Sequence, residues 1–238
     1  MLKIMTLNMW GYYEWENRKE NLLSLIREQN PDCIALQEVQ LNHAFSDYPE
    51  SDFIADNLDY KYRVFAPTYP RNDQIDRDGN RNQRTSYGLA FLSRYPIETS
   101  ETHFLELYPD HDEECSVVFC KVNVAGKLID MCNVHFANSD KHSDLHLHEL
   151  MDVCEKRKQQ PIILGDFNNF NLSSYKSTRL KDYALSTDKN EYTSLPKDDG
   201  TLDYIVAPTS KYSLASVTCP DTYVSDHRAL FATVEYAA

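Results

Sequence analysis

The chain has 238 residues, of which 42% are hydrophobic and 26% are charged, so its composition is that of a globular protein and excludes a disordered tail. Its apolar runs are too short for a transmembrane span, and its 6 glycines form neither a GxGxxG nor a GxxxxGK motif, which disfavours dinucleotide and P-loop sites. The net charge of −13 argues against a general binder of nucleic acid, but not against an enzyme that contacts phosphate through a metal ion.

The first elements along the chain form a strand–helix–strand unit. Residues 3–8 and 33–38 are apolar segments typical of buried strands. Residues 16–29 have the periodicity of an amphipathic helix, which Asn30-Pro31 ends. The short connections predict that the two strands are parallel.

The same order of elements returns in the second half of the chain. Residues 128–135 and 161–166 predict two strands, and residues 143–158 predict the helix between them. His142 and His146 near the start of this helix are four residues apart, and we interpret them as part of a solvent-facing polar stripe.

The remaining segments decide the expected fold class. Antiparallel or closing strands are predicted at 61–66, 88–94, 97–107, 115–124, 202–207, 213–219 and 228–236. About ten strands are too many for one small sheet, which favours two stacked mixed β-sheets with helices outside them. No linker divides the chain, so we expect a single domain over residues 1–238.

Each strand–helix–strand unit carries polar residues where its apolar strands stop. Asn8 and Glu38 are 30 residues apart in the first unit, and His135 and Asp166 are 31 apart in the second. Parallel neighbours bring their carboxyl ends to one edge of a sheet, where ligands bind. We therefore expect these four side chains to lie near a functional site.

Two further motifs carry residue types suited to phosphate chemistry. In GDFNN, the Asp166 carboxylate can bind a hard cation such as Mg²⁺ and the Asn168 amide can donate to a substrate oxygen, although the same letters also suit an ordinary turn. Asp203 lies in an apolar strand, where an unpaired carboxylate is costly. His227 follows Asp226 and can move protons near neutral pH.

Taken together, the ordered motifs TLN, LQEV, NVHF, GDFNN, LDYIV and SDHRAL resemble the endonuclease/exonuclease/phosphatase superfamily. The resemblance runs from residue 3 to residue 236. It implies a four-layered α/β sandwich and hydrolysis of a phosphoester by activated water. It also implies dependence on Mg²⁺, with Mn²⁺ as a substitute.

The resemblance also implies roles for individual residues. Glu38 matches the principal metal ligand, and Asn8 and Asp226 match auxiliary ligands. Asp166 matches the residue that orients the attacking water, and Asn168 matches the donor to a phosphoryl oxygen.

The remaining matched residues concern proton transfer. His227 matches a general base or a stabiliser of the transition state, with Asp226 as the group that orients it and Asp203 as a supporting acid. His135 matches a second catalytic histidine that helps the leaving group. The resemblance places four acids in one cleft, where they would repel each other without a cation, and this favours a metal site.

The sequence leaves the substrate open. Paired histidines favour a phosphodiester over a phosphomonoester. A nuclease acting on DNA or RNA is the alternative within the family, and a catalytically silent binding module is the alternative from another class. The substrate is expected to be a phosphoester, including nucleic acid.

Three further features of the sequence bear on the substrate site and on the location of the protein. The polar insertion 67–86 carries Arg77, Arg81 and Arg84, which either receive an anionic substrate or belong to a solvated loop. Tyr12 and Trp15 either form an aromatic wall beside Asn8 or cover the first helix. Cysteines in apolar stretches, without a CxxC pair, are typical of a reduced cytoplasmic protein.

Overall fold

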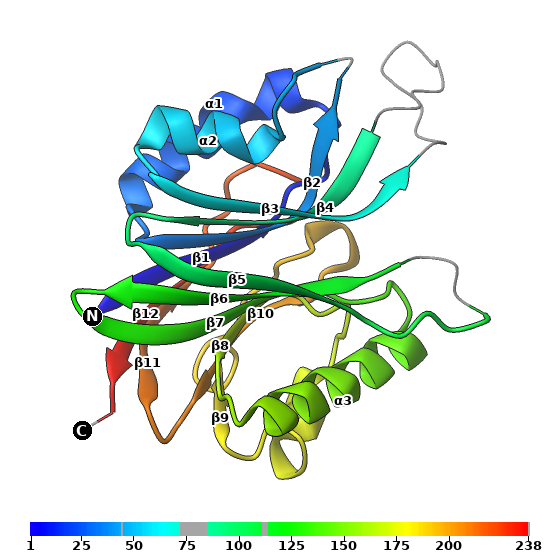
Figure 1. Cartoon of the computed structure of the whole chain (residues 1–238), viewed down its shortest axis with the longest axis vertical. Coiled ribbons are helices and arrows are strands. Elements are labelled where there is room, and N and C mark those ends of the chain that lie inside the picture. The colour runs from blue at the N-terminus through cyan, green and yellow to red at the C-terminus, as the bar shows by residue number, and fades with distance from the viewer. Residues whose placement is uncertain (44, 72–84, 111–113, 238) are drawn as a thin grey trace.

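The structure is a computed structural model that describes residues 1–43, 45–71, 85–110 and 114–237. Within these residues, twelve strands form two six-stranded sheets that stack against each other (Figure 1). Helices α1 (Trp15–Gln29) and α2 (Glu50–Leu58) cover the outer face of the first sheet, and α3 (Asp140–Arg157) covers the outer face of the second. The expected four-layered α/β sandwich is confirmed.

The first sheet has the strand order β11-β12-β1-β2-β4-β3. In this sheet β1 and β2 are parallel and are joined by α1, whereas their outer neighbours β12 and β4 run antiparallel to them. The strands are β1 (Leu2–Asn8), β2 (Cys33–Asn42), β3 (Tyr62–Arg71), β4 (Thr85–Ser93), β11 (Tyr212–Thr218) and β12 (Leu230–Tyr236).

The second sheet repeats this arrangement with the order β5-β6-β7-β8-β10-β9. Its parallel pair is β7 and β8, joined by α3, and β6 and β10 flank the pair in antiparallel orientation. The strands are β5 (Ile97–Phe104), β6 (Ser116–Val124), β7 (Lys127–His135), β8 (Ile162–Asp166), β9 (Tyr183–Leu185) and β10 (Asp203–Pro208). Both predicted parallel pairs are thus present.

Three apolar clusters hold the four layers together. Side chains such as Phe91 and Met131 pack between the sheets. Leu22 and Ile26 pack α1 on the first sheet, and Leu150 belongs to the cluster that joins α3 to the second. Burial of apolar surface is the main term that favours this packing.

Several features of the fold differ from the sequence expectations. Helix α2, strand β9 and the short 3-10 helices η1 (Leu172–Ser177) and η2 (Pro196–Asp198) were not predicted. The expected insertion 67–86 is partly strand, because β3 reaches Arg71 and β4 begins at Thr85.

All six cysteines lie in the described part of the chain and are free, and five of them are buried. In the described ranges, every helix is too short or too polar to cross a membrane.

A buried arginine and a buried glutamate lie near each other where α1, α2 and β2 meet. Arg18 is fully buried and donates to the backbone carbonyls of Gly11, Tyr13 and Val224. Glu50, at the start of α2, is 2% exposed and accepts from the backbone N–H of Gln40 at 3.3 Å. Burial raises the pKa of Glu50 to about 8, and the nearby Arg18 charge offsets this only in part.

This pKa predicts that Glu50 lowers stability as pH rises. Between the unfolded pKa near 4.5 and the folded pKa near 8, the folded chain retains a proton that the unfolded chain has released. The free energy of unfolding should therefore fall with pH across this window, by on the order of 1 kcal/mol per pH unit near its middle.

Denaturant unfolding of the wild type and of Glu50→Gln at pH 5, 7 and 9 measures this contribution. The variant should gain stability relative to the wild type as pH rises, because glutamine does not ionise. A stability difference that stays constant from pH 5 to pH 9 would contradict the prediction.

Candidate active site

Polar residues from three strand ends and from one irregularity within a strand meet where the two sheets come together. Asn8 ends β1 and donates through Nδ2 to Glu38 Oε1 and to Asp166 Oδ2, both at 3.0 Å. His135 ends β7, and its Nε2 atom lies 3.9 Å from Glu38 Oε1 and 3.8 Å from Asp166 Oδ2. The structure thus brings together the four polar residues that follow apolar segments in the sequence.

Glu38 reaches this position through an irregularity in β2. The strand does not end at residue 38 as expected but continues to Asn42, and its pairing with β4 shifts between Leu36 and Val39. Glu38 lies in this bulge with a φ of 54°, a left-handed conformation that is unfavourable for a residue with a side chain. Backbone strain of this kind is typical of functional sites, because the surrounding structure must maintain it.

The segment after β8 is equally constrained. Gly165 has a φ of 149°, and a Cβ atom there would lie 2.0 Å from the carbonyl oxygen of Val134. Asn168 has a φ of 47°, and its backbone N–H donates to Asp166 Oδ1 at 2.9 Å. The Asn168 side chain donates to the carbonyl of Phe136 at 2.8 Å, which leaves one amide N–H for another acceptor.

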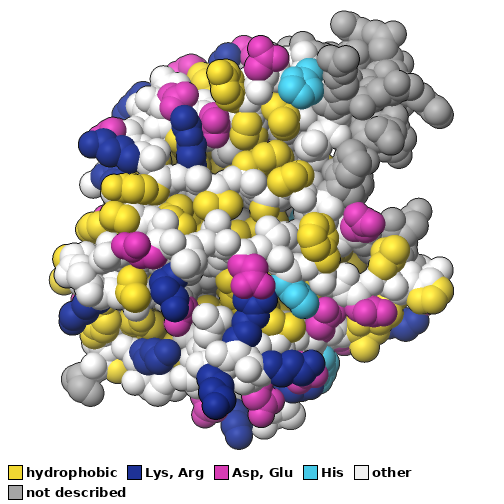
Figure 2. All heavy atoms as spheres, viewed as in Figure 1, with side chains coloured by type: hydrophobic (Ala, Val, Ile, Leu, Met, Phe, Trp, Pro, Cys, Tyr) yellow, Lys and Arg dark blue, Asp and Glu magenta, His cyan; other side chains and the backbone are white. Residues whose placement is uncertain are grey.

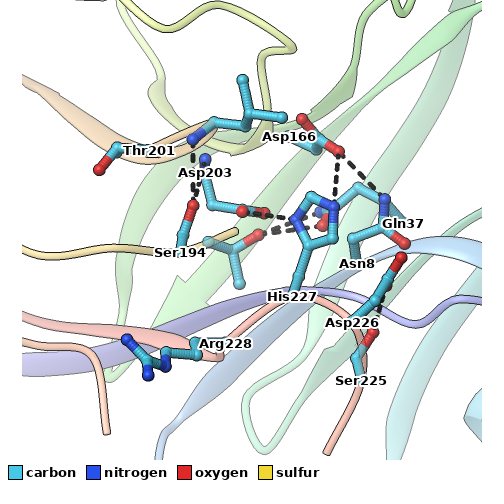
Figure 3. A network of polar contacts seen from close by, with 12 residues as sticks. Asn8, Gln37, Asp166, Ser194, Thr201, Asp203, Ser225, Asp226, His227 and Arg228 are labelled. Atoms are coloured by element: carbon cyan, nitrogen blue, oxygen red, sulfur yellow. Dashed lines mark hydrogen bonds and ion pairs between the residues drawn. The ribbon is translucent and has the colours of Figure 1, made fainter. Parts of the chain in front are cut away.

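His227 lies between two carboxylates of the second sheet (Figure 3). The strand register places Asp203 opposite Asp166, and Asp166 opposite His135. His227 Nδ1 lies 2.7 Å from Asp203 Oδ2, and its Nε2 lies 3.9 Å from Asp166 Oδ2. The pairing of β7, β8 and β10 therefore places His135, Asp166 and Asp203 side by side in the second sheet.

Burial and charge act in opposite directions on this histidine. Burial alone would lower the pKa of His227, but the surrounding carboxylates Asp203, Asp166 and Asp226 raise it to about 10. Burial raises the pKa of Asp203, and the His227 charge opposes that shift. The arrangement favours a cationic imidazole held by Asp203.

The expectation that Asp226 orients His227 is therefore wrong. The partner of His227 Nδ1 is Asp203, which comes 24 residues earlier in the chain. Asp226 instead accepts from Ser225 Oγ at 3.0 Å and lines the cleft. Asp226 and His227 lie in a bend that precedes β12, and adjacency in the sequence did not indicate which carboxylate the imidazole contacts.

The matched residues line a cleft of about 450 Å³, except Asp203, which lies behind His227. Five carboxylates line it, against a single lysine, Lys197, among the described lining residues; the carboxylates are Glu38, Asp140, Asp166, Asp198 and Asp226. Oxygen donors at this density suit a hard divalent cation such as Mg²⁺. The donor set is thus compatible with the expected metal.

A second group of potential ligands overlaps the first. Asp166, Asp203 and His227 offer ligand atoms within 4.8 Å of one another, and all three are buried. A cation bound by all three would have to replace the hydrogen bond between His227 and Asp203. The short 2.7 Å contact favours a proton-holding pair at this position and leaves Glu38 as the more accessible carboxylate.

Sequence reasoning missed part of the cleft wall. Phe170 is 54% exposed although it lines the cleft, and its ring lies against Gly200. Lys197 in η2 and Ser139 at the start of α3 also line the cleft. The sequence carries no distinctive signal for them, since they lie in loops whose course depends on the fold.

The predicted aromatic wall is not formed by the expected residues. Tyr12 and Trp15 are only 7% and 6% exposed and pack in the cluster of α1 and α2, so they are not available to stack on a substrate. The alternative, that they cover the first helix, is correct. Arg77, Arg81 and Arg84 lie outside the described residues.

The histidines of α3 are also not a solvent-facing stripe. His142 and His146 are buried, because the segment before β6 packs over them. His146 Nδ1 accepts from the backbone N–H of Ala137 at 3.2 Å, and its Nε2 donates to the carbonyl of Glu106 at 3.1 Å. His142 lies between Ser139 Oγ and Asp110 Oδ1, at 2.9 Å from each.

The surface charge is mixed on the face shown in Figure 2. Lys and Arg side chains gather over the lower half of this face, in the region of α3, and acidic side chains are interspersed with them. Neither sign forms a continuous stripe there. Charge is concentrated instead in the acidic lining of the cleft.

Comparisons with known proteins concern the family and the fold. A sequence model of the endonuclease/exonuclease/phosphatase family matches residues 5–227. The uncharacterized protein L388 of Acanthamoeba polyphaga mimivirus is 27% identical over 182 residues, which are 70% of this chain and 67% of that protein.

Solved structures share the fold at low sequence identity. An endonuclease/exonuclease/phosphatase family protein from Leptotrichia buccalis has a TM-score of 0.75 at 19% identity and covers 99% of this chain and 100% of its own. The human nocturnin catalytic domain with a bound sulfate anion has a TM-score of 0.73 at 18% identity, over 99% and 94% of the two chains. At these identities the similarity shows the fold alone.

Proposed function

This chain belongs to the endonuclease/exonuclease/phosphatase family, and from that membership we propose that it is a Mg²⁺-dependent phosphodiesterase. Members of the family are generally hydrolases that act on phosphoesters, and they generally depend on a divalent metal ion. The observation that carries the proposal is the meeting of Asn8 and Glu38 from one sheet with His135, Asp166 and His227 in a single acidic cleft.

The metal would be held mainly by Glu38, with Asn8 and Asp226 as auxiliary ligands. When bound, a divalent cation screens the negative charge on the phosphoryl oxygens, and Mn²⁺ can replace Mg²⁺ in such oxygen-rich sites. Asn8 directs its amide nitrogen at Glu38 and Asp166, and its Oδ1 accepts from the backbone N–H of Trp10. In this orientation the Asn8 side chain holds the carboxylates of Glu38 and Asp166 together through its amide nitrogen.

The other residues of the cleft have roles that follow from their hydrogen bonds. Asp166 is held by the backbone N–H of Asn168 and presents its second oxygen to the cleft, where it can orient the attacking water. The second amide N–H of Asn168, which has no acceptor among the described residues, can donate to a phosphoryl oxygen. His227, held by Asp203, can stabilise the charge that grows on the phosphoryl group in the transition state.

His135 is the candidate for assisting the leaving group. It lies on the Glu38 side of Asp166, whereas His227 lies on the Asp203 side. Two histidines on different sides of one carboxylate can serve the entering and departing oxygens separately. Such assistance matters most for a poorly activated alkoxide leaving group, and for this reason we favour a phosphodiester substrate.

A nuclease is the second candidate, and Phe170 and Lys197 favour it. An exposed aromatic ring beside a phosphoester site can stack on a base, and a lysine can contact an adjacent phosphate. Oligonucleotides distinguish this activity from hydrolysis of small diesters.

A substrate panel tests the proposed function. Plasmid DNA, RNA oligonucleotides, bis-p-nitrophenyl phosphate, p-nitrophenyl phosphate and a phospholipid are each incubated with Mg²⁺, Mn²⁺ or EDTA. We expect a diester to be hydrolysed faster than the monoester, EDTA to abolish turnover, and Mg²⁺ to raise the melting temperature by mass action. Undiminished turnover in EDTA, after dialysis against the chelator, would refute the metal dependence.

A further inference from the structure

A buried amide connects the two sheets directly behind the cleft. Asn133 lies in β7, is fully buried, and reaches across to the first sheet. Its Nδ2 donates to the carbonyl oxygens of Leu36 and Ala90, both at 2.9 Å. Its Oδ1 accepts from Gln37 Nε2 at 2.6 Å. The three hydrogen bonds of the Asn133 side chain are thus all made with residues of the first sheet.

The two carbonyls that Asn133 binds border the bulge of Glu38. Leu36 and Ala90 are partners in the β2–β4 ladder, and theirs is the last pair before the register shifts. A bulge disrupts the ladder locally, and buried carbonyls beside it need other donors. One asparagine side chain, with two N–H groups, supplies a donor to each of them.

The bulge contains Gln37 and Glu38. Asn133 contacts Leu36 and Gln37, the two residues that precede Glu38 in the chain, and therefore constrains the backbone next to Glu38. Gln37 lies beside Asn8 in the parallel pair, and its side chain is hydrogen-bonded to Asn133. Glu38 follows it in the left-handed conformation. Loss of the amide would leave two buried carbonyls without these donors and would allow the bulge to relax toward a regular strand.

Asn133 also belongs to the same strand as His135. The two residues are two positions apart, so they project from the same face of β7. Asn133 thereby ties Glu38, on one sheet, to the strand that carries His135 on the other, where His135 Nε2 and Glu38 Oε1 are 3.9 Å apart. The contacts of Asn133 and the hydrogen bond from Asn8 to Asp166 both join the two sheets next to the cleft.

We propose that Asn133 is a positioning residue that holds the Glu38 carboxylate in place and thereby sets the affinity of the cleft for a divalent cation. This inference rests on the proposed function in one respect, the assignment of Glu38 as the principal metal ligand. Residues that orient a metal ligand without touching the metal commonly change metal affinity by about 10- to 100-fold when they are replaced.

A general loss of stability must be separated from this role, and Thr6 offers a matched control. Thr6 is also fully buried and belongs to the same polar group, with its Oγ1 atom 3.3 Å from Gln37 Oε1 and 3.1 Å from Gln37 Nε2. Its hydrogen bonds are to Gln37 and not to the carbonyls of Leu36 or Ala90. Thr6→Val therefore disturbs the buried group while it leaves the donors at the bulge unchanged.

The experiment measures Mn²⁺ binding by calorimetry, together with the melting temperature without metal. Asn133→Ala removes both donors, and Asn133→Thr keeps one hydroxyl donor and a side chain suited to a strand. We expect Asn133→Ala to weaken Mn²⁺ binding by about tenfold or more, Asn133→Thr to lie between Asn133→Ala and the wild type, and Thr6→Val to bind within about twofold of the wild type. This order should hold even if Thr6→Val melts as low as the Asn133 variants.

Glu38→Gln is included as a reference that separates two failures. If Glu38→Gln binds Mn²⁺ as the wild type does, the metal site of the proposed function is wrong. If Glu38→Gln loses binding but folded Asn133 variants keep wild-type affinity, only the role of Asn133 is wrong. Equal weakening in Thr6→Val, or failure of both Asn133 variants to fold, would make Asn133 a residue of general stability and would also overturn the inference.

Discussion

Glu38→Gln is expected to reduce phosphodiester turnover by roughly 10³-fold, because a bound cation contributes several kcal/mol to stabilising the charged transition state. Glutamine keeps the size of the side chain but removes the charge that draws a cation into the cleft. Folding should change little, since the Glu38 side chain is 27% exposed and only Asn8 donates to it among the hydrogen bonds described. The rise of the melting temperature with Mg²⁺ should disappear in the same variant.

Asp198→Asn provides the matched control for this prediction. Asp198 also lines the cleft, but it lies in η2 at the solvent-exposed rim. Loss of its charge should change turnover only slightly, because the effect of an exposed charge is screened by salt. If Glu38→Gln retains the Mg²⁺-dependent rise in melting temperature, Glu38 is not the principal ligand.

His227→Ala should lower turnover by about 10²- to 10⁴-fold, the range typical of positioned acid–base or charge-stabilising groups. The measurement is kcat with saturating Mg²⁺, so that any change in metal affinity does not contribute. The structure gives a further expectation for Asp203→Asn, since Asp203 holds His227 at 2.7 Å. Asp203→Asn should lower kcat substantially as well, although Asp203 does not line the cleft.

His103→Ala separates this effect from the loss of an ordinary histidine–carboxylate pair. His103 Nε2 lies 3.1 Å from Glu149 Oε1, in the contact between β5 and α3 outside the cleft. Its replacement should leave kcat unchanged. Wild-type kcat in folded His227→Ala would remove this residue from the mechanism, and a larger loss in Asp226→Asn than in Asp203→Asn would contradict the assigned orientation of His227.

Most secondary structure of the two strand–helix–strand units was predictable because its signal is local. The predicted strand 3–8 and helix 16–29 correspond to β1 and α1 within two residues. Apolar alternation and helix-ending residues depend on neighbours in the chain and not on the fold. Helix α2 escaped prediction because it is short, at 9 residues, and owes its stability to packing of Ile54 and Leu58 on the first sheet.

The sequence by itself determined the family, the sandwich and which polar residues follow the apolar strands, because these depend on composition and order along the chain. Only the tertiary structure decided how those residues pair. Asn8 meets Asp166 across 158 positions, and Asp203, not the adjacent Asp226, holds His227. Such contacts follow from strand register and from the bulge at Glu38, which arise when two sheets pack and which no local pattern records.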